Sequence, residues 1–268
     1  MRRTASHVVA ATLAAATIAP QTSAQVPHDV VRLEVLPGWR EPDGTHVAGF
    51  RISLAPGWKT YWRSPGDAGI PPRFSLSVSN SLAGLRVAWP VPDVYYINGM
   101  RTIGYEEEVI LPVAFTADDP SVPIRLSGEI ELGVCEDICI PVTFTVGGLL
   151  PPVGGSDPAI RAAIADRPMT EAEAGVGRVV CDISPIDDGL AVSARMELPR
   201  FGESEVAVLE LPDRSIWISE AETRRDGAAI EAAVEMVPPG GAPFAFDRSE
   251  LRITVFADGR AVDIRGCD

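Results

Sequence analysis

Residues 124–146 read IRLSGEIELGVCEDICIPVTFTV. Two β-rich runs, Ile124–Leu132 and Val142–Val146, stand on either side of a pair of cysteines, Cys135 and Cys139. Four residues of extended strand span about 13 Å, whereas a disulfide joins Cα atoms that are about 4.4–6.8 Å apart. If the two cysteines are bridged, the sequence therefore predicts that the chain turns between the two runs.

Short β-rich runs separated by turn residues continue on both sides of this stretch. The runs that precede it are Val30–Val35, His46–Leu54 and Val109–Phe115. The pattern returns after Arg178, and the strands expected there are Val179–Ile183, Leu190–Met196, Glu205–Leu211, Ser215–Ile218, Ala228–Met236 and Leu251–Phe256. Regular short strands with proline and glycine turns are typical of antiparallel sandwiches. The sequence thus predicts an all-β protein built from two β-sandwiches.

The first 24 residues have the layout of a secretory signal peptide. Arg2 and Arg3 form a positive start, Val8–Ala19 is an apolar run, and Thr22-Ser23-Ala24 offers small side chains to a signal peptidase. The apolar run is too short to cross a bilayer of about 30 Å, and no later run approaches the roughly 18 residues that a spanning helix needs. We expect cleavage after Ala24 and export of a chain without a membrane span to the periplasm.

A stretch rich in glycine and proline divides the rest of the chain. Residues Gly147–Gly155 read GGLLPPVGG, and Ser156-Asp157-Pro158 then offers a capping oxygen followed by a proline for a first helical turn. A short helix over Ala159–Asp166 is expected to follow. We predict a signal peptide over 1–24, a first domain over 25–148, a linker with a short helix over 149–175 and a second domain over 176–268.

The chain is strongly acidic, with 37 acidic and 23 basic residues and a formal charge of −14; Lys59 is its only lysine. Such a field repels phosphate backbones, so nucleic acid is not expected as a partner. The sequence contains no phosphate-binding loop, no nucleophile–histidine–acid pattern and no paired-carboxylate signature, which argues against nucleotide enzymes and hydrolases. We expect neither a cofactor nor a resident metal ion.

Four cysteines allow three complete pairings, and the most economical one joins Cys135 to Cys139 and Cys181 to Cys267. Closing the longer of these two loops stabilises the fold by about 4.6 kcal/mol at most, against about 2 kcal/mol for the shorter one. The bridge between Cys181 and Cys267 is therefore predicted to be structural. Three interpretations of the other pair remain open: a redox-active pair, a local structural disulfide without redox activity, or two thiolates that hold Cu(I).

Acidic residues surround the first cysteine pair. Glu136 and Asp137 place two negative charges beside both sulfurs, which is expected to raise the pKa of the thiols. Pro141 restricts the conformation of Ile140 and ends any helical turn that begins at the cysteines. A thiol in this setting is a slow nucleophile by itself and depends on a partner to activate the exchange.

Three segments of the first predicted domain carry distinctive motifs. They are GWKTYWRSPGDAGIPP over 57–72, the series WPVP, YYING, GYE and VILPV over 89–113, and GVCEDICIP over 133–141. In this order and spacing they resemble the periplasmic N-terminal domain of the DsbD thiol:disulfide interchange family. They are most similar to its ScsB-like branch, which is associated with copper tolerance, and the resemblance covers roughly residues 29–146.

This resemblance implies an immunoglobulin-like sandwich that carries its redox cysteines at one edge. Cys135 and Cys139 would be the catalytic pair, and Cys139 would form the mixed disulfide with a partner. The cap loop that covers the pair in the family would be Tyr95, Tyr96, Ile97, Asn98 and Gly99. Tyr105 and Glu106 are candidates to support this loop. The second domain resembles the additional sandwich of the ScsB-like branch.

The resemblance also implies redox partners. In the family this domain takes electrons from a thioredoxin-like domain and passes them to oxidised periplasmic proteins. Full-length members continue into a membrane domain and a thioredoxin-like domain with a CxxC motif, and this sequence contains neither. We therefore expect a stand-alone exported protein that works with a membrane electron-carrier protein and a periplasmic protein of thioredoxin fold. The alternative is a non-catalytic periplasmic module that docks a redox partner or handles Cu(I), with structural disulfides only.

Overall fold

The computed structural model describes residues 30–66, 68–79, 85–97, 99–116 and 118–268. The predicted signal peptide lies outside the described residues, as do Asn98 of the predicted cap loop and the side chain of Ile97. Within the described part of the chain, no helix is long and apolar enough to cross a membrane.

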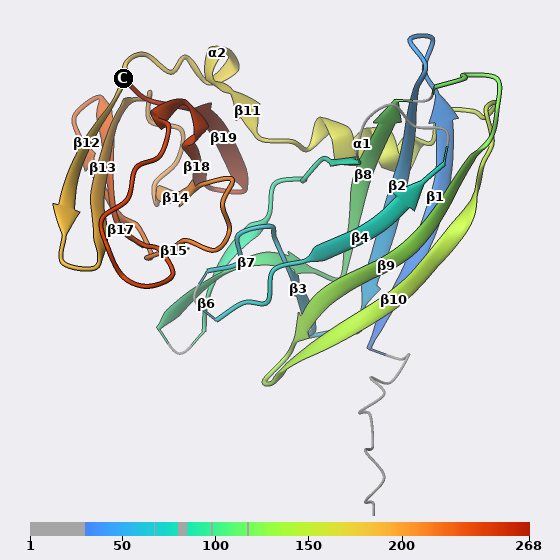
Figure 1. Cartoon of the computed structure of the whole chain (residues 1–268), viewed down its shortest axis with the longest axis horizontal. Helices are drawn as coiled ribbons and strands as arrows, with labels where there is room; N and C mark the ends of the chain where they lie inside the picture. The colour runs from blue at the N-terminus through green and yellow to red at the C-terminus, as the bar shows by residue number, and fades with distance from the viewer. Residues whose placement is uncertain (1–29, 67, 80–84, 98, 117) are drawn as a thin grey trace, which may run out of the picture.

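Residues 31–150 form two antiparallel sheets that enclose one core (Figure 1). The first sheet has the order β1-β2-β8-β5, with the strands β1 (Val31–Arg40), β2 (Thr45–Leu54), β5 (Arg86–Val87) and β8 (Glu108–Thr116). The second sheet has the order β10-β9-β3-β7-β6, and β4 pairs with β9 at its side. Its strands are β3 (Lys59–Tyr61), β4 (Arg73–Val78), β6 (Asp93–Ile97), β7 (Met100–Glu106), β9 (Ile124–Cys135) and β10 (Cys139–Leu150). We call this unit the N-terminal sandwich.

Residues 169–265 form two further sheets, which we call the C-terminal sandwich. One has the order β11-β19-β18-β14, with β11 (Met169–Thr170), β14 (Val206–Glu210), β18 (Arg252–Ala257) and β19 (Arg260–Arg265). The other has the order β12-β13-β17-β15, and β16 also pairs with β17. Its strands are β12 (Val179–Ile186), β13 (Gly189–Glu197), β15 (Trp217–Ile218), β16 (Glu222–Asp226) and β17 (Ala229–Val237). Two short helices, α2 (Glu171–Ala174) and η1 (Arg248–Glu250), lie at its ends.

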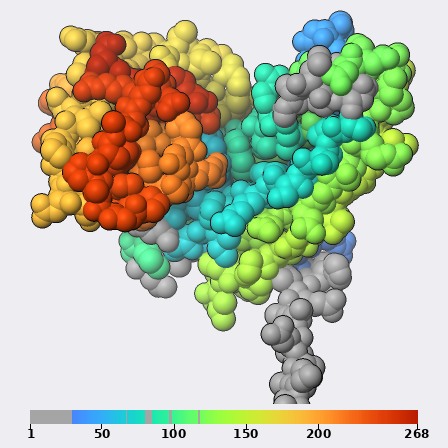
Figure 2. Space-filling model, viewed as in Figure 1, coloured from blue at the N-terminus to red at the C-terminus, as the bar shows by residue number. Residues whose placement is uncertain are grey.

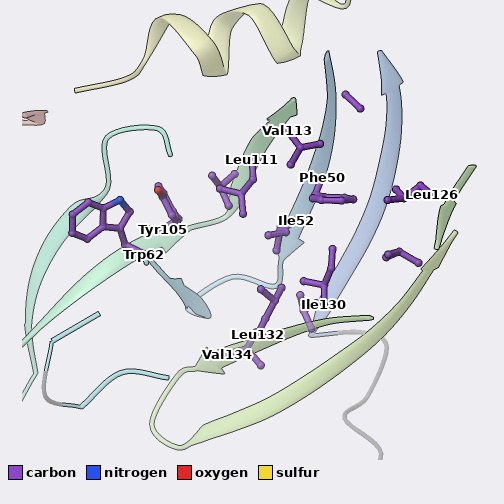
Figure 3. Packing of buried hydrophobic residues seen from close by; sticks show 14 of the residues in the cluster. Phe50, Ile52, Trp62, Tyr105, Leu111, Val113, Leu126, Ile130, Leu132 and Val134 are labelled. Atoms are coloured by element: carbon purple, nitrogen blue, oxygen red, sulfur yellow. The ribbon is translucent and has the colours of Figure 1, made fainter. Parts of the chain in front are cut away.

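Alternation along β9 explains how the N-terminal sandwich closes. Successive side chains of a strand point to opposite faces of the sheet. The residues that face the core are Ile124, Leu126, Ile130, Leu132 and Val134, all nearly inaccessible to solvent. They pack against Phe50, Ile52, Leu111 and Val113 of the opposite sheet (Figure 3). The strand thereby delivers Cys135 to the end of the sheet in a register that the core fixes.

The connection between the sandwiches contains the predicted helix. Strand β10 continues through Gly147 and Gly148 to Leu150, so the sheet extends into the glycine-rich stretch. Helix α1 (Pro158–Ala165) follows, and the Asp157 carboxylate caps it by accepting hydrogen bonds from the backbone N–H groups of residues 159 and 160. Ile160 is fully buried beside Leu36, Trp39 and Ile110, which fixes the helix on the first sheet.

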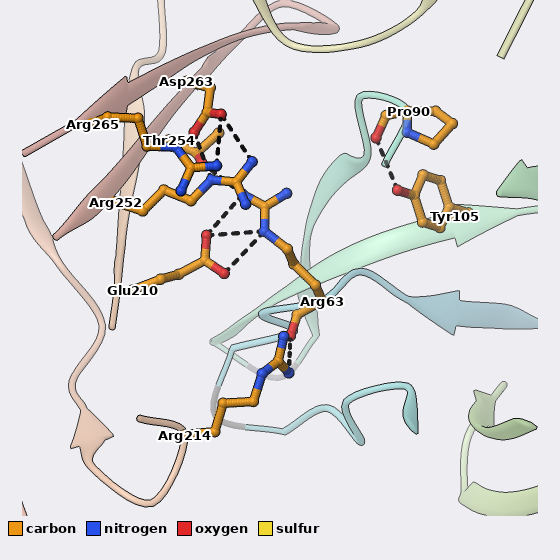
Figure 4. A network of polar contacts seen from close by, with 9 residues as sticks. All are labelled: Arg63, Pro90, Tyr105, Glu210, Arg214, Arg252, Thr254, Asp263 and Arg265. Carbon is orange, nitrogen blue, oxygen red and sulfur yellow. Dashed lines mark hydrogen bonds and ion pairs between the residues drawn. The ribbon is translucent and has the colours of Figure 1, made fainter. Parts of the chain in front are cut away.

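The two sandwiches share a packed contact (Figures 1 and 2). Three residues of the C-terminal sandwich, Val208, Phe256 and Ala261, belong to the same buried cluster as the core of the N-terminal one. Phe256 meets the fully buried Trp62 edge to face, with ring centroids 5.1 Å apart. Arg63 crosses the same contact to form a buried ion pair with Glu210 (Figure 4).

The all-β prediction is confirmed, and every strand predicted from an apolar run is present with shifted ends. The structure also contains strands that these runs did not include: β3, β4, β5, β6, β7, β11, β16 and β19. Strands such as β3 and β5 have too few residues to produce a period, and β16 reads ETRRD, which is polar on both faces. Strands β3, β4, β5 and β11 are placed by pairing with strands that are distant in the sequence, whereas β6, β16 and β19 pair with the strand next to them in the sequence.

Candidate redox site

The first cysteine pair lies at the tip of the hairpin formed by β9 and β10. Cys135 ends β9, Cys139 begins β10, and the two residues face each other directly in the antiparallel register. Their Cα atoms are 4.2 Å apart and their sulfurs form a disulfide. The chain turns through residues 136–138, as the sequence analysis predicted for a bridged pair.

The two sulfur-bearing residues differ in their access to solvent. Cys135 is 3% exposed, whereas Cys139 is an exposed residue at the start of the edge strand β10. Ile138, which precedes it, is 75% exposed. A partner protein that approaches the hairpin tip therefore meets Cys139 and an apolar side chain first, with Cys135 behind them.

Tyr61 contacts both sulfurs. Its hydroxyl oxygen lies 2.7 Å from Cys135 Sγ and 3.0 Å from Cys139 Sγ, and because a disulfide carries no hydrogen, the tyrosine is the donor. Tyr61 is the last residue of β3 and is almost fully buried. Burial raises the pKa of the Tyr61 phenol, so the group keeps its proton and remains a donor at neutral pH. Sequence reasoning did not single out Tyr61, although the motif at 57–72 contains it.

The segment that follows β3 lies against the disulfide. The carbonyl oxygen of Ala68 is 3.9 Å from Cys139 Sγ. Ile70 packs so closely on the backbone of Gly133 that a Cβ atom at Gly133 would lie 2.5 Å from the Ile70 Cβ and 2.9 Å from the Tyr61 ring. Glycine at position 133 thus lets this segment and Tyr61 approach β9 next to the cysteines.

Lys59 lies beside the pair on the strand next to β9. It is directly opposite Cys135 on one side and Glu106 on the other. Its ammonium group is 2.8 Å from a Glu106 carboxylate oxygen and 5.2 Å from the centre of the Tyr95 ring. Lys59 and Tyr61 are two residues apart on β3, so their side chains leave the sheet on the same face. The site therefore combines a cation, a phenol donor and two sulfurs.

Of the predicted cap loop, Tyr95 and Tyr96 lie on β6 and Gly99 directly precedes β7. Tyr95 packs on Lys59 and donates a 3.3 Å hydrogen bond to Asp93, and burial, with the carboxylates of Asp93 and Glu106, raises the pKa of its phenol. Tyr96 is 63% exposed and lines a small pocket with Phe256 and other residues of the C-terminal sandwich. Tyr95 thus contacts Lys59, whose backbone lies opposite Cys135. That these residues and Gly99 act as a cover over the sulfurs stays a prediction.

The two predicted supporting residues have separate partners. The hydroxyl of Tyr105 is buried and donates a 2.9 Å hydrogen bond to the carbonyl of Pro90, and burial raises the pKa of this phenol well above its usual value (Figure 4). Glu106 is partly exposed and holds the Lys59 ammonium. Glu106 therefore belongs to the polar surroundings of the disulfide, whereas Tyr105 anchors the chain before β6.

The second disulfide lies far from this site in the fold. It joins Cys181 on β12 to Cys267 near the end of the chain, with Cα atoms 5.7 Å apart. Backbone hydrogen bonds link Cys181 to Asp268 and Asp268 to Val179, and the Arg248 side chain donates to the carbonyls of Cys181 and Asp268. This bridge fastens the last residues of the chain to β12.

Metal ligation is limited by the side chains available. In the reduced protein the two cysteine thiolates would offer soft ligands for Cu(I). Among the described residues, no group of three or more histidine, cysteine or carboxylate side chains is placed to hold a metal ion.

Comparisons with known proteins agree with this architecture. A solved structure of the N-terminal periplasmic domain of ScsB from Proteus mirabilis superposes with a TM-score of 0.67 at 22% identity, covering 91% of this chain and 96% of that one. A marsupial T cell receptor gives a TM-score of only 0.20 at 8% identity, over 90% of this chain and 97% of that one, and is too distant to inform the fold. No curated protein sequence matches the chain. The family model for the N-terminal domain of thiol:disulfide interchange protein DsbD matches residues 25–149. These residues, which include the N-terminal sandwich and the hairpin with Cys135 and Cys139, match the DsbD N-terminal family.

Proposed function

We propose that this protein carries out thiol–disulfide exchange through Cys135 and Cys139 and passes electrons to a partner of thioredoxin fold. The observation that carries the proposal is the asymmetry of the pair: Cys139 is exposed at the hairpin tip, and Cys135 is buried directly behind it. An exposed sulfur is needed to reach a partner's disulfide, and a second sulfur within bonding reach is needed to release that partner.

The exchange takes two steps. The Cys139 thiolate attacks one sulfur of the partner's disulfide, whose S–S bond breaks and whose other sulfur leaves as a thiolate. The Cys135 thiolate then attacks Cys139 Sγ in the mixed disulfide, which closes the 135–139 bridge and releases the partner's second thiolate. The partner gains two electrons and the cysteine pair loses two. Each thiolate that leaves the partner takes up a proton according to its pKa and the pH.

Tyr61 stabilises charge on the sulfurs during these steps. Its hydroxyl lies within hydrogen-bond distance of both sulfurs. A hydrogen bond to a thiolate is stronger than one to a neutral sulfur. Tyr61 therefore favours the thiolate form of whichever cysteine carries the charge, and it offsets the effect of the neighbouring acidic residues Glu136 and Asp137.

The proposed setting is the periplasm, where an oxidised pair has to be reduced again by another protein. A membrane electron-carrier protein with a thioredoxin-like donor would perform the two steps in reverse. The likeness in fold to a periplasmic domain of ScsB and the signal-peptide layout of residues 1–24 support this setting. A link to copper tolerance rests on the same likeness.

Trapping the mixed disulfide tests the proposal. In Cys135→Ala the resolving sulfur is missing, so reaction with an oxidised protein of thioredoxin fold should accumulate a covalent complex through Cys139, visible on a non-reducing gel. Cys139→Ala is the matched control and should give little complex, because the sulfur of Cys135 is buried. If Cys135→Ala forms no complex with any oxidised thioredoxin-fold protein offered, the non-catalytic binding module becomes the better account.

A further inference from the structure

Three consecutive residues connect the disulfide to the C-terminal sandwich. Tyr61 donates to the sulfurs, Trp62 packs edge to face on Phe256, and Arg63 pairs with Glu210. Figure 3 shows Trp62 at the end of the N-terminal core, and Figure 4 shows Arg63 reaching across to Glu210. The strand that places the phenol on the sulfurs therefore continues directly into the contact between the sandwiches.

The contact at Arg63 is tightly built. Its Nε and Nη2 atoms donate to the two oxygens of Glu210 at 3.0 and 2.8 Å, and Nη2 also donates to Thr254 at 3.1 Å. The side chains of Arg63 and Glu210 are 4% and 14% exposed. Arg214 donates a further hydrogen bond to the Arg63 carbonyl. A buried bidentate pair of this kind is rigid, because breaking it leaves a charge without a partner away from water.

Strand β3 depends on such an anchor because it is short. It contains only residues Lys59–Tyr61, and Tyr61 is its last residue. Beyond this point the chain leaves the ladder, and the backbone of Trp62 is held by one hydrogen bond to Ile103. A second backbone hydrogen bond joins the Ile103 N–H to the Pro65 carbonyl. The side chains of Trp62 and Arg63 add contacts with Phe256 of β18 and Glu210 of β14 in the C-terminal sandwich.

The segment after Arg63 is held between the disulfide and the same sandwich. Ser64, Pro65 and Gly66 line a groove of about 560 Å³ together with residues of the C-terminal sandwich, among them Arg214. A few residues further on, Ala68 and Ile70 lie against Cys139 and Gly133. The chain after Tyr61 thus runs from the contact with the C-terminal sandwich at Arg63 to the disulfide at Ala68.

We propose that Glu210 and Phe256 are positioning residues for the redox pair, and that the C-terminal sandwich acts through them to keep the Tyr61 hydroxyl on Cys135 and Cys139. The inference rests on the proposed exchange function. Neither residue contacts a sulfur; each acts through Trp62 or Arg63. Because the Tyr61 hydrogen bond stabilises a thiolate more than a disulfide, this support favours the reduced pair.

The test measures how the 135–139 pair equilibrates with glutathione in the full chain. Phe256→Leu removes the ring that contacts Trp62, and Glu210→Ala removes the partner of Arg63. In both variants the equilibrium constant for reducing the pair should fall at least threefold, a shift of about 14 mV at about 30 mV per tenfold change for a two-electron couple. Alkylation of Cys139 in the reduced protein at pH 7 should slow by a similar factor.

A matched control separates positioning from loss of stability. Glu205 and Arg225 form another largely buried bidentate ion pair, and Arg225 also donates to the carbonyl of Leu198 within the same C-terminal sandwich. Glu205→Ala should destabilise the sandwich, as judged by hydrogen exchange in β14, yet leave the glutathione equilibrium of the 135–139 pair unchanged. A shift in Glu205→Ala as large as that in Glu210→Ala would overturn the proposal.

A double-mutant cycle identifies the route of the effect. In a Tyr61→Phe background, Phe256→Leu and Glu210→Ala should cause no further change, because the hydroxyl through which they act is gone. Wild-type values in both single variants, or full additivity with Tyr61→Phe, would refute the positioning role. If Glu210→Ala does not fold, the double-mutant cycle is measured with Phe256→Leu and Tyr61→Phe. A wild-type pair that glutathione cannot reduce would instead refute the exchange function itself.

Discussion

Lys59, the only lysine of the chain, lies directly opposite Cys135 across β3 and β9. On the neighbouring strand β7 it faces Glu106, whose carboxylate is 2.8 Å from its ammonium group. A cation next to a sulfur favours the thiolate, and a carboxylate released from its ion pair disfavours it. The row Cys135–Lys59–Glu106 therefore places one cation on the strand next to that of the buried cysteine and one carboxylate on the strand after it.

Replacing this cation should make the pair less reactive. In Lys59→Met we expect the midpoint of the pH profile for alkylation of the reduced cysteines to rise by about 0.5–1 pH unit, because the positive charge is lost and Glu106 is left unpaired. Iodoacetamide labelling followed by mass spectrometry measures this profile. Lys59→Arg keeps the charge and should stay near wild type; an unchanged midpoint in Lys59→Met would show that the cation does not act on the sulfurs.

Removing the Tyr61 hydroxyl should favour the disulfide. Tyr61→Phe keeps the ring that lies close to Gly133 but loses the donor to both sulfurs. A hydrogen bond to a charged group contributes about 1.5–3 kcal/mol, so we expect the thiolate, and with it the reduced pair, to lose about 1–2 kcal/mol. Redox titration against glutathione measures the change. Thr60→Ser, which keeps its hydroxyl on the Gly133 carbonyl, is a control on the same strand and should leave the titration unchanged.

Much of the fold follows from the sequence because β9 and β10 carry their own signals. The alternation of Ile130, Leu132 and Val134 marks a half-buried strand, and the spacing of Cys135 and Cys139 requires a turn if they are bridged. The helix start at Asp157 was equally local, since the capping carboxylate and the proline stand next to each other.

The site was only partly predictable for the opposite reason. Tyr61 reaches the sulfurs because β3 pairs with β9, and Arg63 finds Glu210 across 147 residues of sequence. No local pattern encodes either contact. Tyr61 stands between Trp58 and Trp62 in the sequence, where an aromatic residue is ordinarily expected to pack in the core. Only the assembled sheet shows that its hydroxyl is a hydrogen-bond donor to the sulfurs.

The two disulfides should differ in their effect on stability. We expect Cys181→Ser with Cys267→Ser to lower the free energy of unfolding of the C-terminal sandwich by about 2–4 kcal/mol, because the bridge closes a long loop and fastens the chain end to β12. Hydrogen exchange in peptides from β12 and β19 measures this. The Cys135–Cys139 bridge closes only a short loop, so replacing both cysteines by serine should lower the free energy of unfolding of the N-terminal sandwich by about 2 kcal/mol or less. Equal losses would contradict the structural role assigned to the Cys181–Cys267 bridge.

His46 should make the N-terminal sandwich sensitive to mild acid. Its ring is fully buried, with Nε2 donating to the Pro37 carbonyl at 2.7 Å and Nδ1 accepting from Arg40 at 3.3 Å, and burial lowers its pKa. The unfolded chain then binds a proton that the folded chain does not. The stability is fully present above the unfolded pKa of about 6.5 and is lost as the pH falls toward the lower folded pKa. Urea unfolding at pH 7 and pH 5.5 should give a smaller difference for His46→Gln than for wild type; an equal difference would assign the acid sensitivity to other groups.

The proposed exchange requires that the Cys135–Cys139 bridge can be reduced at the potentials of thioredoxin-fold proteins. The most direct measurement is thiol trapping and mass spectrometry across graded glutathione ratios. We expect half of the Cys135–Cys139 disulfide to be reduced between about −120 and −270 mV, the range of exchange-active dithiols, while Cys181–Cys267 stays closed. A Cys135–Cys139 bridge that persists below about −300 mV, alongside Cys181–Cys267, would mean that both disulfides are structural.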